Sequence, residues 1–310
     1  MSNELLYSGL GDLQLAAILN QELTLKLADR AGLGVHPAII DFGDIAGRGS
    51  TVLKIPIAGL DGYDEMAAVA EGSASSNTAL TDGSVNLTIA RQSIQRTMSD
   101  LAGIVNGGRV DPARLADDMV GAAQMRLLSM ICGLFSSFGS GVGSTGVDFD
   151  LDQWFEGDQV LNLAAAPGDG RLAVLHPIQV ANLKASLRAE GNAISYMDAT
   201  KEMLLAMGPG MNGRFMGYDV FQTTRAPSIN SNADRQGAML AKGAIGKVFG
   251  TRRPMIGDGT GGLRIEQGTP IYIGFERDEA YTFTKIVGSM YSGVGILQDG
   301  LGVKITSDHE

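Results

Sequence analysis

Two glycine-rich stretches have the spacing of a dinucleotide-binding loop. They are Gly141, Gly143 and Gly146, and then Gly257, Gly259 and Gly262. Such a loop binds pyrophosphate when a strand precedes it and a helix begins at it, because the helix then presents its N–H groups to the phosphates. The first stretch follows a predicted helix and runs into an acidic loop, and no helix is predicted after the second. We interpret both as glycine-rich loops and predict no cofactor.

Three alternating acids, Asp148, Asp150 and Asp152, imitate the first half of a calcium-binding loop. That loop requires glycine at its sixth position and glutamate at its twelfth. Here these positions hold Gln153 and Gln159. The stretch is therefore predicted to be a solvated acidic loop that binds no metal, with a loose cation site as the alternative.

No catalytic arrangement is visible among the remaining reactive residues. His36, His176 and His309 are far apart in the sequence, and no Gly-x-Ser-x-Gly nucleophile motif is present. The single cysteine, Cys132, lies in an apolar part of a predicted helix, so we interpret it as a small core residue. One cysteine excludes an intramolecular disulfide and every zinc site that needs several cysteines. We predict that the protein is not an enzyme.

The composition indicates a chain that hides surface against other chains. Charged residues make up only 19% of the sequence, and 43 of its 310 residues are glycine, about twice the usual share. The chain has 24 basic and 34 acidic residues, giving a net charge of −10. This balance lacks the basic surface that sequence-independent nucleic-acid binding needs. The chain could enclose DNA, but we do not expect it to bind DNA tightly.

Two features bear on membranes. Glu4 and Asp12 interrupt the start of the chain, so no signal peptide is predicted. Residues 127–147 carry no charge over about the length of a membrane span. Their second half is rich in serine and glycine, which is typical of a loop. We interpret the stretch as a buried helix end and predict a soluble protein.

The first hundred residues predict an arm followed by a long hairpin. Apolar residues within 13–27 favour one short helix that ends near Gly32. Alternating apolar residues within 53–57 and 85–89 then predict two strands. The segment between them, 58–83, has few large apolar side chains and cannot form a core of its own. It is far longer than the usual hairpin loop of 2–5 residues, so a projecting β-arm is predicted.

One long helix follows the hairpin. Asp111 is a good N-cap, Pro112 suits the first helical position, and Gly139 suits the position after the helix. Apolar residues between them recur at helical spacing. A helix over 112–138 would be about 40 Å long at ~1.5 Å per residue, and would span the subunit.

The remaining chain predicts a mixed α/β lobe and a closing β segment. After a Gly/Ser-rich and acidic loop, an apolar strand over 172–175 leads through His176 into a helix that begins at Pro177. Alternating residues within 271–275 and 281–283 and a short strand at 303–305 complete the chain in β-structure.

This order of elements resembles that of tailed-phage major capsid proteins of the Hong Kong 97 type. Short segments carry the resemblance at matching places along about 260 residues. They are Ala70-Glu71-Gly72, Ser99-Asp100-Leu101-Ala102, the helix from Asp111 to Phe138, Val174-Leu175-His176-Pro177, Lys242-Gly243-Ala244-Ile245, Tyr291-Ser292-Gly293 and Gly302-Val303-Lys304-Ile305. The resemblance implies an α+β capsid fold with a peripheral domain, an axial domain, an extended hairpin loop and an N-terminal arm.

The resemblance also implies a division of the chain. Its parts are an N-terminal arm (1–48), an extended loop (49–97), a first peripheral part (98–171) with a spine helix (112–138), an axial domain (172–262) and a peripheral return (263–310). Copies would form pentamers and hexamers and close into an icosahedral shell around double-stranded DNA, in a virion assembled in the host cytoplasm. A portal and decoration proteins are further expected partners. Only 111 residues precede the spine helix, so we expect any scaffolding protein to be separate.

Some relatives join their subunits covalently through a lysine in the extended loop. Here the only lysine between Lys26 and Lys184 is Lys54, at the base of the predicted hairpin. We therefore predict that this shell is not covalently crosslinked.

Acidic residues are concentrated in the predicted loop. No lysine or arginine occurs between Ile55 and Ala90. The acids are Asp61, Asp64, Glu65, Glu71 and Asp82, and the basic residues proposed as their partners on a neighbouring copy are Arg109, Arg114, Arg252 and Arg253. A solvated acidic tip is an equal alternative, because exposed ion pairs contribute little.

Two other functions fit parts of the sequence. An encapsulin-like bacterial nanocompartment would have the same fold and would enclose cargo enzymes instead of DNA. A glycine-rich nucleotide-binding enzyme is the alternative from a different class.

Overall fold

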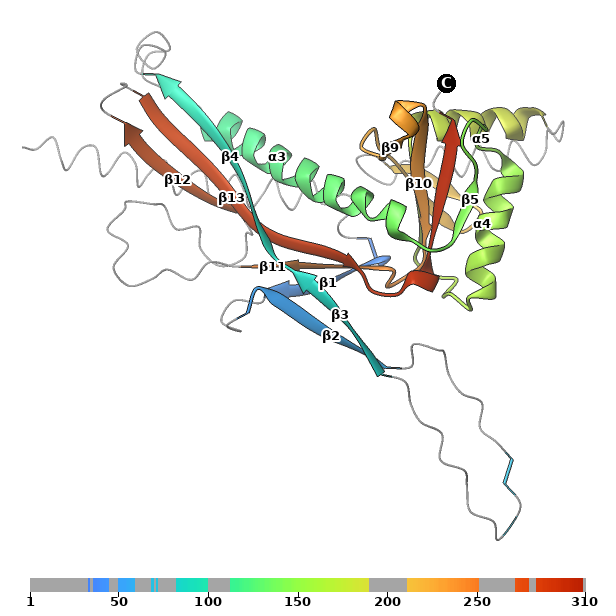
Figure 1. Cartoon of the computed structure of the whole chain (residues 1–310). Helices are drawn as coiled ribbons and strands as arrows, with labels where there is room; N and C mark the ends of the chain where they lie inside the picture. The colour runs from blue at the N-terminus through green and yellow to red at the C-terminus, as the bar shows by residue number, and fades with distance from the viewer. Residues whose placement is uncertain are drawn as a thin grey trace, which may run out of the picture.

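The computed structural model describes most of the chain in two β-sheets, a separate hairpin and three α-helices (Figure 1). The described residues are 33, 36–44, 50–58, 68–69, 71, 82–99, 112–189, 211–250, 271–278 and 283–308 of the 310. The predicted helix within residues 13–27 lies outside them.

The first sheet is five-stranded and is organised around its longest strand, β13. Its strands are β1 (Ile39–Asp44), β4 (Ala90–Ser99), β11 (Ile245–Phe249), β12 (Ile271–Asp278) and β13 (Phe283–Ile296). Strand β4 pairs antiparallel with β13 along one edge. On the other edge, β12 pairs with the first part of β13 and β11 with its last part, while β1 pairs parallel with β11.

The second sheet is seven-stranded and mixed. Its strands are β5 (Gly141–Gly143), β6 (Arg171–Leu175), β7 (Met211–Phe215), β8 (Tyr218–Gln222), β9 (Ser228–Ile229), β10 (Asp234–Leu240) and β14 (Gly302–Asp308). The order is β5-β14-β10-β6-β8-β7, and β9 pairs with β10. The last strand, β14, therefore lies inside this sheet, between β5 and β10.

Both faces of the seven-stranded sheet are covered, as its uniformly buried strand β6 indicates. Ala173 and Leu175 face one apolar cluster, which contains Trp154 of helix α4 (Leu151–Leu163) and Leu183 of helix α5 (Pro177–Ala189). Leu172 and Val174 alternate with them and face a second cluster. The two helices consequently lie beside the sheet on the side away from α3 (Figure 1).

The predicted long helix is confirmed as α3 (Pro112–Gly133), but its predicted end at Phe138 is wrong. After Gly133 the chain tightens into a 3₁₀ turn, η2 (Phe135–Ser137), where Ser137 N–H donates to the carbonyl of Leu134 at 2.9 Å. The tighter turn lets both Phe135 and Phe138 be buried. They join Ile131 and Cys132 in the second cluster, which contains residues of both sheets and so binds the two sheets into one body.

The sequence missed helix α4, because residues 139–171 were predicted to be a loop. Asp150 caps this helix, accepting the N–H of Gln153 at 2.9 Å. Gly157 lies on the buried face, where an added Cβ would lie 2.6 Å from the sulfur of Met239 in β10. Glycine, which disfavours a helix in the sequence pattern, is therefore what lets α4 approach the sheet.

A buried arginine fixes α4 to the sheet. Arg171 donates to Asp158 Oδ1 (2.6 Å), Asn162 Oδ1 (2.7 Å), Tyr218 Oη (3.1 Å) and the carbonyls of Pro167 (3.0 Å) and Ala166 (3.1 Å). The Tyr218 hydroxyl also donates to Asp158 at 2.7 Å. Burial, and then the bond to Asp158, raises the pKa of Tyr218. The network has an acceptor for every nitrogen of the guanidinium, which is what allows so polar a group to be buried.

The two sheets interleave along the sequence. Strand β11 belongs to the five-stranded sheet although it lies within the predicted axial range 172–262, and β14 belongs to the seven-stranded sheet although it lies within the predicted return 263–310. The predicted domains are defined by their place in a shell, so that division stays a prediction.

Candidate assembly surfaces

The predicted hairpin is present, with its base on the five-stranded sheet. Strand β2 (Val52–Ala58) pairs antiparallel with β3 (Asp82–Thr88) in a separate two-stranded ladder. Leu53 and Leu87 are buried at its base against Val248 of β11, with Phe42 packed beside them. This small cluster packs the base of the hairpin against the body, and most of residues 59–81, between the strands, lie outside the described part of the chain.

The predicted assembly acids and their basic partners are largely outside the described residues too. Of the acids, Glu71 is exposed in a turn and Asp82 begins β3, while Asp61, Asp64 and Glu65 are not described. Among the basic residues, Arg114 lies in the first turn of α3, and Arg109, Arg252 and Arg253 are not described. Their roles therefore stay predictions. Lys54 lies in β2, exposed and opposite Asn86 of β3.

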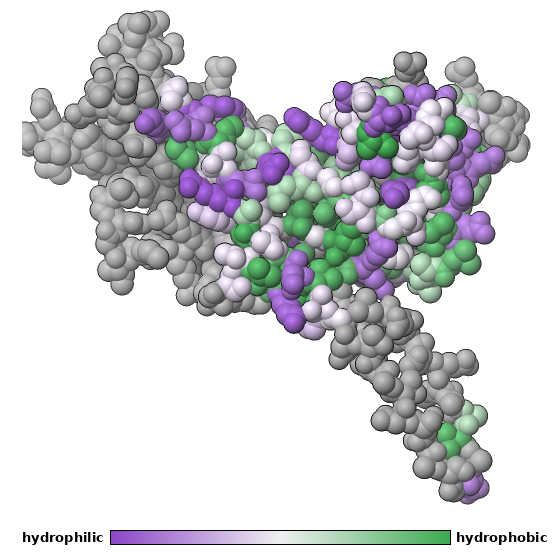
Figure 2. Space-filling model, viewed as in Figure 1, coloured by the Kyte–Doolittle hydropathy of each residue, from purple (hydrophilic) through white to green (hydrophobic). Residues whose placement is uncertain are grey.

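The C-terminal half of α3 carries an apolar surface. Within the described chain, the stretch Asp118–Ser137 is long and apolar enough to cross a membrane, yet only 28% of it is buried. Its end, from Ile131 onward, belongs to the core, as the sequence predicted, whereas Met125 is 51% exposed. Hydrophobic residues gather over this part of α3 in the middle of the molecular face in Figure 2. Exposed apolar side chains on a helix are candidates for contact with another chain, so this face of α3 is a candidate assembly surface.

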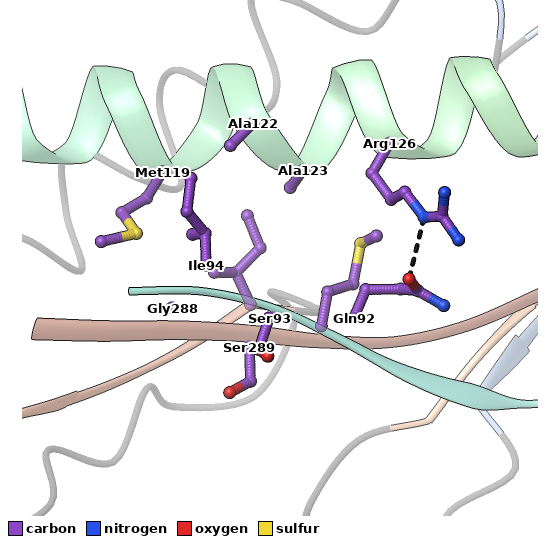
Figure 3. A pocket seen from close by; sticks show the side chains of 11 residues that line it. Gln92, Ser93, Ile94, Met119, Ala122, Ala123, Arg126, Gly288 and Ser289 are labelled. Carbon is purple, nitrogen blue, oxygen red and sulfur yellow. Dashed lines mark hydrogen bonds between the residues drawn. The ribbon is translucent and has the colours of Figure 1, made fainter. Parts of the chain in front are cut away.

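Between α3 and the sheet lies a hollow of about 290 Å³ (Figure 3). Its walls are mainly apolar, with Met119 and Ala123 on the helix and Ile94 and Met290 on β4 and β13. At its rim, Arg126 Nε donates to Gln92 Oε1 at 2.8 Å. Arg126 is the one titratable side chain among the described residues that line the hollow, so these residues offer no pair of groups for acid–base chemistry.

A second polar contact joins α3 to β4. Arg96 donates from Nε and Nη2 to the two carboxylate oxygens of Asp118, at 2.7 and 3.0 Å. These hydrogen bonds lower the pKa of Asp118 and raise that of Arg96. Both side chains are about half exposed, so solvent screens the pair.

Exposed apolar side chains on the seven-stranded lobe were missed from the sequence. Leu163 at the end of α4 is 79% exposed, and Phe155, two turns earlier, is 48% exposed. Met216 is 45% exposed in the two-residue turn between β7 and β8, with a left-handed φ of 47°. Single exposed apolar side chains are common on protein surfaces, so these three are further candidates for contact between copies and do not by themselves show such a contact. Single apolar residues in a helical pattern do not reveal which side will be left uncovered.

Of the histidines and acids considered for chemistry, four have structural partners: His36, His176, Asp148 and Asp150, the N-cap of α4. His309 lies outside the described residues. His36 Nδ1 accepts the Ala38 N–H at 3.2 Å, so its Nε2 donates to Asp219, 3.0 Å away. His176 is buried at the corner between β6 and α5, as predicted, and its Nδ1 accepts the N–H of Ile178. Asp148 accepts a hydrogen bond from Asn182. In the described part of the chain, no three His, Cys, Asp or Glu side chains are grouped to hold a metal ion.

Cys132 and the first glycine motif also have structural places. Cys132 is fully buried, which raises the pKa of its thiol from 9.0 to about 12, as expected of a core residue. Gly141 and Gly143 lie in strand β5, paired with β14. The second motif, within 257–262, lies outside the described residues.

No family model matches the chain, and no curated protein matches it in sequence. Its structure, in contrast, resembles solved structures along most of its length. A chain of Mycobacterium phage Che8 is 16% identical with a TM-score of 0.56, covering 83% of this chain and 84% of that one. A chain of the capsid of Ralstonia phage GP4 is 11% identical with a TM-score of 0.59, and 89% of each chain is covered. A chain of the SrpI encapsulin complex of Synechococcus elongatus PCC 7942 is 12% identical with a TM-score of 0.57, covering 86% of this chain and 84% of that one.

The chain therefore has the fold of proteins that form capsid and encapsulin shells. More narrowly, it is the α+β Hong Kong 97-like capsid fold predicted from the sequence, and the resemblance to the two phage chains covers 83% and 89% of this chain.

Proposed function

We propose that the protein is the major capsid protein of a tailed phage, a structural protein that assembles into an icosahedral shell around double-stranded DNA. The observation that carries the proposal is a fold shared along more than four fifths of the chain with phage capsids. The hairpin supports it, because a small cluster holds its base on the body and its ladder of seven residue pairs runs outward from there to Ala58–Asp82. A two-stranded ladder is at best marginally stable alone, so it gains stability when laid across a neighbouring copy.

The exposed surfaces support the same proposal. The apolar face of α3 and the side chains of Leu163 and Met216 lie on different parts of the subunit. Several separate contact areas let one subunit touch several neighbours, as a closed shell requires. Weak contacts multiplied over many copies then stabilise the shell.

The predicted parts extend this proposal to the shell. The seven-stranded lobe would form most of the axial domain, and the five-stranded sheet with α3 the peripheral domain. A separate scaffolding protein, a portal and decoration proteins would be its partners in the virion. The net charge of −10 suits a wall that encloses DNA without gripping it.

An encapsulin-like nanocompartment is the second candidate, because the encapsulin structure matches about as well as the phage capsids. Electron microscopy of the expressed protein tests both. Round shells support a shell protein, and only unassembled subunits under all assembly conditions would contradict it. The contents then distinguish the two: packaged DNA in particles from infected or induced cells indicates a phage capsid, and an enclosed protein indicates a nanocompartment.

A further inference from the structure

The hairpin leaves the five-stranded sheet at one well-defined joint. Strand β4 pairs with β13 as far as Ala90, which lies opposite Ser292. One residue earlier, Ile89 belongs to neither ladder, and its N–H donates to the carbonyl of Thr51 at 2.8 Å. Strands β3 and β4 are thus nearly one continuous run that changes partner at Ile89, from β13 to β2.

Beyond the joint, β3 crosses over β13 instead of pairing with it. The crossing occurs at two glycines of β13. Gly293 directly follows Ser292, and Gly295 is two residues further on. A Cβ added at Gly293 would collide with the backbone carbonyl oxygen of Thr88, well inside the 3.0 Å that real Cβ atoms keep, and would lie 2.9 Å from its carbonyl carbon. A Cβ at Gly295 would lie 2.6 Å from Cδ2 of Leu87.

The two contacts differ in how easily they can yield. The atom opposite Gly293 belongs to the backbone, so a larger residue there must move the strand itself. The atom opposite Gly295 is the end of a leucine side chain, which can change rotamer, although Leu87 is fully buried. Neither glycine has a positive φ in the structure, so close approach is what excludes a side chain here.

We infer that Gly293 and Gly295 form a seat that sets the angle at which the hairpin leaves the subunit, and that this angle in turn sets the geometry of assembly. The second half of this inference rests on the proposed capsid function, and the first half does not. The ladder of seven residue pairs is about 23 Å long at ~3.3 Å per residue, so a small tilt at Thr88 is magnified along it.

The angle can be measured in unassembled subunits. Cysteines at Ser84, exposed in β3, and at Gln159, exposed on α4, would carry spin labels, while native Cys132 is buried and does not compete. We expect Gly293→Ala to change the distance between the labels by on the order of 3 Å, given a displacement of about 1 Å at Thr88 and the ~3.3 Å rise per residue. Gly295→Ala should change it less. The matched control is Gly168→Ala in the loop between α4 and β6, where an added Cβ meets nothing within 4 Å and the distance should not change.

Particle size gives the second measurement. We expect Gly168→Ala to form particles of the normal diameter, and Gly293→Ala to form particles of altered diameter or open sheets. An unchanged label distance in a folded Gly293→Ala subunit would overturn the inference that these glycines set the angle of the hairpin. If that variant does not fold, Gly295→Ala decides, and its unchanged distance would overturn the inference equally. A changed distance with normal particles would refute the link to assembly alone, and a wild-type chain that forms no shells would refute the proposed function while leaving the distance test intact.

Discussion

Two arginine–aspartate pairs in the described part of the chain have nearly equal shortest N···O distances and very different burial. The shortest N···O distance is 2.6 Å for Arg171–Asp158 and 2.7 Å for Arg96–Asp118. The exposed fractions of the arginine side chains are 9% and 50%. Replacing each arginine by methionine, which keeps most of the length and removes the charge, therefore compares a buried arginine that donates to five residues with an exposed one that donates to Asp118.

We expect Arg171→Met to destabilise the subunit strongly. Breaking a buried ion pair by removing one partner costs about 3–5 kcal/mol. Asp158 is itself 33% exposed and keeps its bond from Tyr218, so water can replace part of the loss, and the lower end of the range applies. At roughly 2–4 °C per kcal/mol, a loss of about 3 kcal/mol lowers Tm by about 6–12 °C. Arg96→Met should lower Tm far less, because solvent already screens that pair.

Circular dichroism of unassembled subunits during heating would measure both changes, and urea unfolding would check them. The far-ultraviolet spectra at low temperature should match that of the wild type. Equal losses in the two variants would refute the reasoning, because Arg171 is the arginine that is both buried and bonded to several residues. A small loss for Arg171→Met alone would show that the network is replaceable by apolar packing.

Four further outcomes are expected. Leu163→Lys should leave the subunit folded and reduce shell formation in light scattering, whereas normal assembly would show that this end of α4 touches no neighbour. Glu71→Lys should impair assembly without lowering Tm, and normal particles would favour the solvated acidic tip. The Cys132 thiol should resist a thiol reagent until denaturant is added, and the stability it contributes should be lost as pH rises from about 9 through about 12, because the unfolded chain ionises first. Mature particles should give a single subunit band on a denaturing gel, since Lys54 lies within the β2 ladder; covalent ladders would contradict this.

Sequence patterns predicted the elements whose signals are local. The alternation around Leu53 and Leu87 predicted the hairpin strands, and Pro112 predicted the start of α3 because it suits the first helical position. Helix α4 was missed because a glycine such as Gly157 lowers helix propensity. Glycine is needed there because the sulfur of Met239, which is distant in sequence, leaves no room for a side chain.

The candidate assembly surfaces were harder to predict, for a physical reason. Charges in a sequence can be counted, and this produced the acidic loop residues as candidates. Whether Phe155 or Leu163 is buried depends on which side of α4 meets the sheet, and that is decided by packing with β10 and β14. The glycine seat likewise depends on a crossing between residues 87–88 and 293–295, which no local pattern encodes.

The place of β14 has a consequence for synthesis of the protein. Strands β5 and β10 leave the ribosome long before residues 302–308, yet both use β14 as a neighbour. Until that strand arrives, each has an open edge, and the seven-stranded sheet cannot close. A translation product that stops before residue 302 therefore lacks an inner strand of the lobe. In an assembly of many identical copies, one faulty copy weakens every neighbour that it touches. Because the lobe needs β14, a subunit whose translation stops before residue 302 cannot complete the lobe and is less able to join the assembly.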